Sequence, residues 1–174
     1  PQYREFRNRE GMVNKDVNAQ KSLQLITGID RFLNLWGRPF IFTTQAYYKL
    51  LWDLNPYEID NVRIRYYANN IARGYASGLD IRINGEFISG TQSWFSLGLL
   101  KTMEDIKNDE NGFKRRPSDQ RITMGAFFED HLPNDPSLRV YLNLNFGSGY
   151  PFGPPNSSTY RNTFKGDEYY RVDI

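Results

Sequence analysis

The feature that most constrains this chain is a two-residue alternation of apolar and strongly polar side chains. In residues 78–84 (GLDIRIN), Leu79, Ile81 and Ile83 alternate with charged and amide side chains. Residues 138–146 (LRVYLNLNF) repeat the pattern. Because successive side chains of a β-strand point to opposite faces, each segment predicts a strand with one apolar and one polar face. Charge and amide groups opposite an unbroken apolar row are typical of a wall between lipid and a water-filled lumen, as in a transmembrane β-barrel.

Seven segments carry this pattern, and the connections between them alternate in length. The expected strands are 21–33, 40–52, 74–87, 92–104, 119–131, 138–147 and a seventh that begins at 168. The short connections are 34–39, 88–91 and 133–137, and the long ones are 53–72, 105–118 and 148–167. Transmembrane barrels keep periplasmic turns short and extracellular loops long, so this alternation favours an antiparallel barrel wall. Within the first long connection, residues 61–67 (NVRIRYY) predict a strand that extends beyond the membrane.

Composition argues against several other classes of protein. Aromatic residues make up 16% of the 174 residues, with 12 Tyr and 12 Phe, which suits strands and the aromatic girdles of outer-membrane barrels. The chain has no apolar run long enough for a transmembrane helix, and its mean hydropathy is −0.66. The net charge of +2 is nearly balanced, which argues against nucleic acid as a partner. Because cysteine is absent, there is no disulfide framework and no thiolate metal site.

The two ends of the sequence lead to a further expectation. Residue 1 is Pro1, and the sequence stops at Ile174 within a strand-like segment, YYRVDI. We therefore expect this chain to be an interior segment of a longer polypeptide. An open sheet of this kind leaves two edges of unpaired backbone, which lipid does not tolerate, so the expected wall requires further strands.

Six longer segments carry a more specific pattern. They are 38–51 (RPFIFTTQAYYKLL), 72–87 (ARGYASGLDIRINGEF), 90–102 (GTQSWFSLGLLKT), 115–133 (RRPSDQRITMGAFFEDHLP), 144–156 (LNFGSGYPFGPPN) and 169–174 (YYRVDI). In order and in spacing they resemble the late barrel strands of TonB-dependent outer-membrane receptors of the Bacteroidetes type. The resemblance implies an all-β, antiparallel fold in which this chain supplies about seven strands of a larger barrel, of about 22 strands.

That family implies a barrel that is occluded by an N-terminal plug and energised through TonB in the bacterial outer membrane. Residues 1–174 then correspond to a partial barrel domain, without the plug and the final strands, in a receptor that takes up an unidentified ligand. The implied partners are the plug of the same polypeptide, TonB through the absent N-terminal region, lipid and lipopolysaccharide. An outer-membrane lipoprotein or other complex subunits are further implied partners.

The polar faces and the strand ends supply the candidate site residues. The residues expected to face the lumen and the plug are Asp80, Arg82, Asn84, Arg121, Thr123, Arg139, Asn143 and Asn145. The residues expected to form an aromatic girdle at the membrane surfaces are Tyr48, Trp52, Trp94 and Phe128. Because arginine–carboxylate contacts are geometrically specific, we expect the polar set to bind the plug rather than the transported ligand. The sequence does not identify ligand-binding residues.

The sequence predicts no catalytic residue, no metal site and no cofactor, so we expect no enzyme. His131 is the one histidine, and a metal or general-base role requires partners of a kind that the chain lacks. Glu129 and Asp130 are adjacent, so on a strand they face opposite ways, unlike the paired carboxylates of a glycosidase. Residues 105–112 contain acidic side chains but lack the spacing and the closing Glu of a calcium loop.

Two alternatives to a transport wall stay open on the sequence. The same barrel fold serves as a scaffold in larger outer-membrane assemblies, in which case the parent protein need not transport anything. A soluble glycan-binding β-sandwich also has alternating strands, but it hides its apolar rows in one packed core and does not sort its loops by length.

Overall fold

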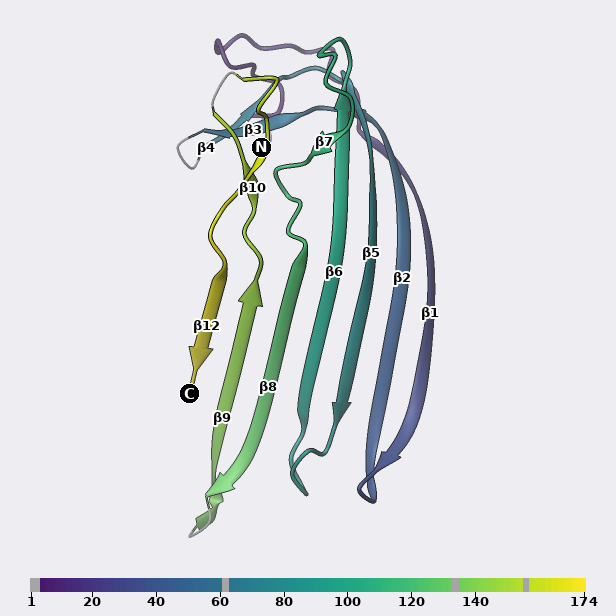
Figure 1. The fold of residues 1–174 in the computed structure, drawn as a ribbon, viewed down its shortest axis with the longest axis vertical. Helices are drawn as coiled ribbons and strands as arrows, with labels where there is room; N and C mark the ends of the chain where they lie inside the picture. The colour runs from purple at the N-terminus through teal and green to yellow at the C-terminus, as the bar shows by residue number, and fades with distance from the viewer. Residues whose placement is uncertain (1–3, 61–62, 133–134, 155–156) are drawn as a thin grey trace.

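The described part of the chain is an all-β, antiparallel structure. The computed structural model describes residues 4–60, 63–132, 135–154 and 157–174, apart from the side chain of residue 136, and it contains no helix in these ranges. The main sheet has eight strands, seven of which follow the order β1-β2-β5-β6-β8-β9-β12 (Figure 1). Their bounds are Lys21–Leu35 (β1), Arg38–Leu54 (β2), Ala72–Gly85 (β5), Ser93–Ile106 (β6), Ile122–Leu132 (β8), Asp135–Gly147 (β9) and Tyr169–Asp173 (β12). The short strand β7 (Lys114–Arg115) pairs with β6.

All seven expected strands occur, with bounds that differ from the expected ones by three residues at most. The largest shifts are at β8, which begins at Ile122 rather than 119, and at β9, which begins at Asp135 rather than 138. Asp119 and Gln120 leave the strand because their side chains bond to the backbone of other segments, at Thr102 and Ser148. Residues 133 and 134 of the expected turn at 133–137 lie outside the described residues.

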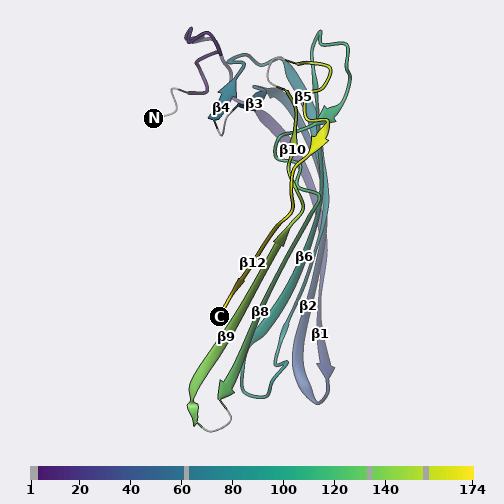
Figure 2. The ribbon, with the colours of Figure 1, turned by 60° about the vertical axis from the view of Figure 1, so that its left-hand side comes forward.

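The short and long connections lie at opposite ends of the sheet (Figures 1 and 2). Two long connections carry small hairpins: β3 (Tyr57–Asp60) pairs with β4 (Arg63–Tyr66), and β10 (Pro151–Phe152) pairs with β11 (Phe164–Lys165). Strand β4 lies within the strand expected at 61–67, of which residues 61 and 62 lie outside the described residues. Its partner β3 was not expected from the sequence. The long connections and residues 4–20 gather at one end, which is called the loop end below.

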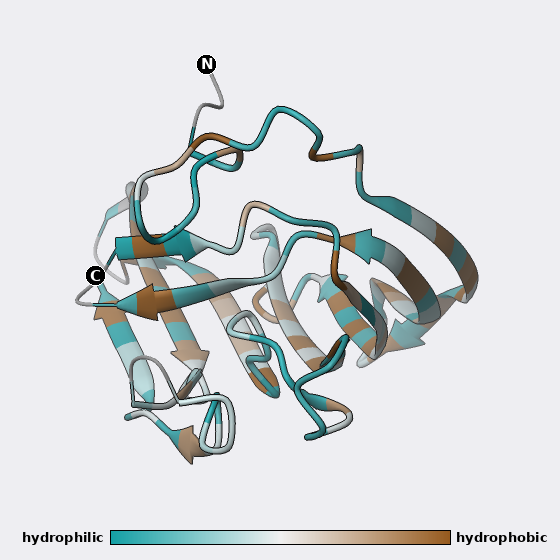
Figure 3. Ribbon diagram, turned by 90° about the horizontal axis from the view of Figure 1, so that it is seen from above, coloured by the Kyte–Doolittle hydropathy of each residue, from teal (hydrophilic) through white to brown (hydrophobic). Residues whose placement is uncertain are grey.

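The alternation of the sequence is preserved across the whole sheet, because the register pairs polar positions with polar positions and apolar positions with apolar ones. Residues directly opposite each other on antiparallel strands share a face. One row across the seven strands is Asp30, Thr43, Arg82, Ser96, Gly125, Asn145 and Arg171. The next row, on the other face, is Ile29, Thr44, Ile81, Leu97, Met124, Phe146 and Tyr170. Hydrophilic and hydrophobic bands accordingly alternate along the curved strands (Figure 3).

Most of the apolar face of the sheet is uncovered, and Phe40 is buried on it against Phe87. No second sheet of comparable size exists among the described residues, which otherwise form only two-stranded hairpins. Apolar side chains in the strands therefore stay accessible: Leu25 is 75% exposed, Val172 58% and Leu138 52%. The described sheet is also open, since β1 and β12 are its two edges and do not pair with each other.

The small hydrophobic core lies at the loop end, on the polar face. Its buried members are Leu51, Leu54, Ala72 and Ile106, with Tyr67 and Ile71 packed against them. Leu54 pairs with Ala72, which pairs with Ile106, and Ala72 lies an even number of positions from Asp80, so these side chains share the face of Asp80. The first long connection therefore folds over the polar face rather than the apolar one.

The turn between β1 and β2 depends on a left-handed backbone. Trp36 and Gly37 have φ angles of 55° and 74°, which is the pattern of a two-residue type I′ hairpin turn. Gly37→Ala should lower the stability of the protein by about 1 kcal/mol, because a side chain at this φ strains the backbone while nothing crowds the site. The check is the urea-unfolding midpoint, with Ser89→Ala in another exposed turn as the control. An unchanged midpoint for Gly37→Ala would contradict the strain argument.

Candidate functional site

Seven of the eight residues expected to face the lumen lie on one face of the sheet, and Arg121 lies just before β8. Asp80, Arg82 and Asn84 alternate along β5, and the register aligns this row with Thr123, Asn143 and Asn145 through intervening strands. Arg139 continues the same row of β9 and pairs with Glu129 at 2.5 Å. Arg121 precedes β8 in the same alternation, but its Nε donates to Asp119 Oδ2 at 2.7 Å. The polar set is thus brought together as a surface, and Arg121 is drawn towards the loop end.

Glycine residues concentrate on this polar face. Gly28, Gly78, Gly98, Gly125 and Gly147 all belong to the polar rows. A Cβ atom at Gly78 would meet the ring of Tyr47, and one at Gly98 would meet the side chains of Asp80 and Thr123. Neighbouring side chains therefore lie across the sheet where glycine leaves room for them.

An aromatic and cationic stripe crosses four strands near the short-turn end of the polar face. The guanidinium of Arg82 lies over Trp94, 5.1 Å from the ring centroid. Trp94 stacks on Phe127 with centroids 6.4 Å apart, and Phe127 stacks on Tyr141 at 5.7 Å. This stripe provides a flat apolar platform within an otherwise polar surface.

The expected girdle residues divide between the two faces. Tyr48 stacks on Tyr75 at 6.1 Å, on the apolar face near the loop end, and Trp52 lies in the same alternation as Tyr48. Phe128 lies on the apolar face near the other end, where it packs edge-on against Phe87 at 5.7 Å. Trp94 instead belongs to the polar stripe. Tyr48, Trp52 and Phe128 thus lie on the apolar face and Trp94 lies on the polar face; the girdle itself stays a prediction.

A buried ion-pair cluster connects the loop end to the sheet. Glu104, near the end of β6, is completely buried and contacts two arginines from different connections. Arg116 Nε donates to Glu104 Oε2 at 3.1 Å, and Arg161 Nη1 donates to Glu104 Oε1 at 2.5 Å. Arg161 is itself 3% exposed. One carboxylate of the sheet thus holds the second and third long connections together.

Asp119 is the second buried carboxylate of this cluster. Its Oδ1 accepts from the backbone N–H of Thr102 at 2.6 Å, at a point of β6 beyond its pairing with β8. Its Oδ2 accepts from Arg115 Nε at 2.6 Å and from Arg121 Nε at 2.7 Å. Asp119 therefore satisfies a backbone donor of β6 and two guanidinium groups at once.

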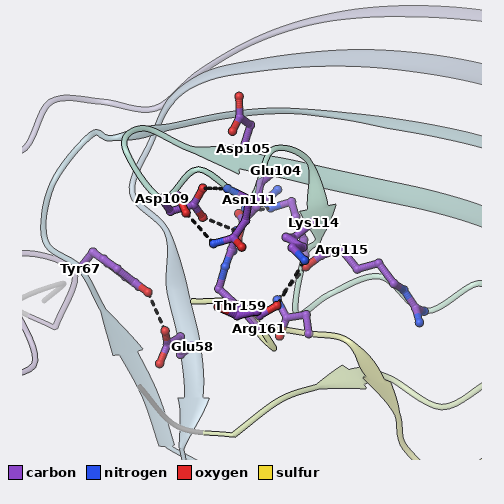
Figure 4. Close-up of polar contacts among 12 residues, drawn as sticks. Glu58, Tyr67, Glu104, Asp105, Asp109, Asn111, Lys114, Arg115, Thr159 and Arg161 are labelled. Carbon is purple, nitrogen blue, oxygen red and sulfur yellow. Dashed lines mark hydrogen bonds and ion pairs between the residues drawn. The ribbon is translucent and has the colours of Figure 1, made fainter. Parts of the chain in front are cut away.

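A cavity of about 330 Å³ opens beside Arg161. Its wall includes Glu58, Tyr150, Phe152 and Asp167. Arg161 Nε is buried without a hydrogen-bond partner, and Arg161 Nη2 lies 3.7 Å from Asp109 Oδ2 (Figure 4). The cavity combines hydrogen-bonding groups with aromatic rings at the loop end, which makes it a candidate ligand pocket.

Tyr67 and Glu58 form a separate polar pair in the first long connection (Figure 4). The Tyr67 hydroxyl donates to Glu58 Oε1 at 2.6 Å. Burial raises the pKa of Tyr67, and the hydrogen bond to Glu58 together with its negative charge raises it further. Arg9 lies 3.4 Å from the other oxygen of Glu58, so this carboxylate joins residues 4–20 to β3.

The described residues contain no group of three or more His, Cys, Asp and Glu side chains that could hold a metal ion. Glu129 is engaged by Arg139, and Asp130 accepts from the backbone N–H of His131 at 2.7 Å. These groups make structural contacts at the end of β8.

No helix in the described part of the chain has the length and apolar character needed to cross a membrane.

The sequence did not identify the Glu104–Asp119 cluster. Lys114–Arg116 is visible as a basic run, but nothing local connects it to Glu104 or to Arg161, which lies 57 residues further along the chain from Glu104. In the sequence, the cluster is indicated only by the basic run Lys114–Arg116 and by an acidic residue, Glu104, near the end of a predicted strand.

Comparison of the chain with known protein families, with curated proteins and with solved structures finds no match in any of the three.

The buried position of Glu104 makes a testable contrast with its neighbour. Glu104→Gln should lower the stability by about 3–5 kcal/mol, because it leaves two guanidinium groups without their carboxylate. Asp105→Asn should cost less than about 1 kcal/mol, because its partner Arg73 is 71% exposed at the side chain. The measurement is the free energy of unfolding in urea for both variants. Equal losses would contradict the assignment of Glu104 as a buried anchor.

Tyr67 predicts a loss of stability at alkaline pH. The folded protein holds the Tyr67 proton more tightly than the unfolded chain, in which tyrosine titrates near pH 10.0. Its contribution is therefore complete below that pH and is lost as the pH rises towards the raised pKa of the folded state. The urea-unfolding midpoint of the parent protein should fall between about pH 8 and about pH 11, and Tyr67→Phe should make this fall smaller. The exposed Tyr160→Phe variant is the control and should fall as the parent does.

Proposed function

We propose that this chain is a wall segment of a TonB-dependent receptor in the bacterial outer membrane and contributes to the energised uptake of a ligand. The observation that carries the proposal is the single sheet of seven strands with one continuous apolar face and one continuous polar face. A membrane wall needs this arrangement, because lipid lies on one side and a polar lumen on the other.

The exposed apolar face supports lipid as the contact on that side. Contiguous exposed apolar surface marks a membrane or protein contact, and here it extends over every long strand. The six strands β1, β2, β5, β6, β8 and β9 have 11–17 residues, which is enough to cross a bilayer at the usual tilt. Tyr48, Trp52 and Phe128 lie on this face near the strand ends and would form the girdle.

The loop end supports an extracellular mouth above the polar face. The first long connection packs on the polar side of the sheet, and the Glu104–Asp119 cluster holds the other two. Loops that fold inward over a lumen have this geometry. The open edges β1 and β12 would pair with further strands of the wall.

The polar face supports a plug as the partner inside the lumen. Asp80, Arg82 and Asn84 offer charge and amide groups, and the stripe from Arg82 to Tyr141 offers an apolar platform. The interface with a folded domain such as a plug combines polar and apolar contacts of these two kinds. TonB would act through that plug.

The two alternatives differ in their support. A scaffold in a multi-subunit outer-membrane complex uses the same wall and differs only in whether a ligand is transported. A soluble glycan-binding sandwich requires two apolar faces packed on each other, whereas the described chain has one large sheet with an exposed apolar face.

Adjacent arginine substitutions in β8 test the proposal. Met124 lies on the apolar face and aligns through Leu97 and Ile81 with Thr44, so its level is four positions from Phe128 and four from Tyr48. Met124→Arg should reduce the free energy of folding into lipid vesicles by about 2–4 kcal/mol, because a charge enters the bilayer near its midplane. Thr123→Arg on the polar face is the matched control, with a change of less than about 1 kcal/mol on the lumen side.

The yield of folded, protease-resistant protein in vesicles, measured against urea concentration, gives both values. If Met124→Arg folds as well as Thr123→Arg in vesicles, the apolar face does not contact lipid and the proposal fails. If Met124→Arg abolishes folding in water as well as in vesicles, the apolar face is a packed core and the sandwich replaces the wall.

A further inference from the structure

Four arginines converge on one pocket at the tip of the loop end. The pocket has a volume of about 390 Å³, and the residues that line it are Arg4, Arg7, Asn8, Arg63, Ile64, Arg65 and Tyr66. No carboxylate lines it among the described residues. The arginines come from two segments about 60 positions apart, so it is the fold that brings their positive charges together.

Hydrogen bonds fix the first of these segments against the first long connection. Asn55 Nδ2 donates to the carbonyl oxygen of Glu5 at 2.8 Å. Asn14 Nδ2 donates to the carbonyl oxygen of Ala68 at 2.9 Å. These hydrogen bonds at Glu5 and Asn14 therefore fix the segment that carries Arg4 and Arg7 beside β4.

The pocket arginines lack the ion pairs that other arginines of this chain form. Arg115, Arg116, Arg121 and Arg161 each contact a carboxylate, whereas Arg4, Arg7, Arg63 and Arg65 contact none among the described residues. The nitrogen Arg65 Nε is buried without a hydrogen-bond partner. Leaving such a donor unsatisfied is costly unless a ligand or water accepts from it.

The carboxylate nearest to Arg65 along the hairpin is already in use. Glu58 lies directly opposite Arg65 in the β3–β4 register. Its two oxygens contact the Tyr67 hydroxyl at 2.6 Å and Arg9 at 3.4 Å. Glu5 follows Arg4 in the sequence, and its charge adds to burial in raising the pKa of Tyr66, which lines the pocket. Asp60 lies directly opposite Arg63 in the hairpin but does not line the pocket. The lining itself therefore carries four positive charges and no negative one.

We propose that this four-arginine pocket binds a phosphate group, carried either by a free solute or by a lipid headgroup. The planar guanidinium fork offers two parallel donors to a phosphate, and several such forks surround a doubly charged anion with complementary charge. The proposal does not depend on the membrane assignment of the sheet, because it rests on the loop end alone.

Titration with inorganic pyrophosphate tests the site in the full chain, held in a non-ionic detergent and followed by calorimetry. We expect saturable binding that weakens about tenfold or more in Arg65→Gln and in Arg7→Gln, since each variant removes charge-assisted hydrogen bonds. Arg31→Gln removes an equal charge from β1, far along the chain from the pocket, and should bind as the parent does. Glu5→Gln should bind more tightly, because it removes the nearby negative charge; this gain cannot arise from misfolding.

Vesicles distinguish the two sources of phosphate. If phosphatidylcholine vesicles containing lipid A displace pyrophosphate and phosphatidylcholine vesicles alone do not, the site takes a lipid headgroup. If neither vesicle displaces it, the site takes a free solute. Equal weakening in Arg31→Gln and Arg65→Gln, or no tightening in Glu5→Gln, would overturn the proposal.

Discussion

The continuous apolar face of a single sheet is the constraint on which the rest of this structure depends. Burial of apolar surface is the main favourable term in folding, yet the long strands bury little of theirs within the described chain. A partner or a solvent that covers this face must supply the missing stabilisation. The same holds for the backbone of β1 and β12, whose outer edges have no partner strand in the sheet. The account of a membrane wall satisfies both needs together, with lipid on the face and further strands at the edges.

The long connections at the loop end need packing contacts that are separate from those of the sheet. The hydrophobic cluster of Leu51, Leu54, Ala72 and Ile106 is small, and buried ion pairs provide the other contacts that hold the connections. Glu104 and Asp119 contact four arginines from the second and third connections and satisfy a backbone donor of β6. Removing Glu104 would leave the buried Arg161 without its nearest carboxylate, so this contact helps to specify one arrangement of the loops. The free arginines at the tip contrast with these and mark a surface that is open to an anion.

The parts of this fold that the sequence predicts are those encoded locally. Alternation is a two-residue signal, so the strands and the shared face of Asp80, Arg82 and Asn84 follow from it directly. Alternation also places Trp94 on the face of Ser96, but its aromatic character suggested a girdle, and only the register with Arg82 and Phe127 shows the stripe. Strand β4 falls within the predicted segment 61–67, but its partner β3 was not predicted, because a four-residue strand gives only a weak periodic signal. The pairing of Glu104 with Arg161 depends on how three loops meet, which no local pattern encodes.

The accessibility of successive positions along β9 tests the central claim most directly. The chain has no cysteine, so single-cysteine variants from Tyr141 to Phe146 each carry one spin label in lipid bilayers. The account predicts a period of two, in which labels at 142, 144 and 146 collide with oxygen dissolved in lipid. Labels at 141, 143 and 145 should instead be accessible to a water-soluble nickel chelate or be shielded from both reagents by a plug. If the even-numbered labels are shielded from oxygen, or if they are accessible to the nickel chelate, the apolar face does not contact lipid and the sheet is not a membrane wall.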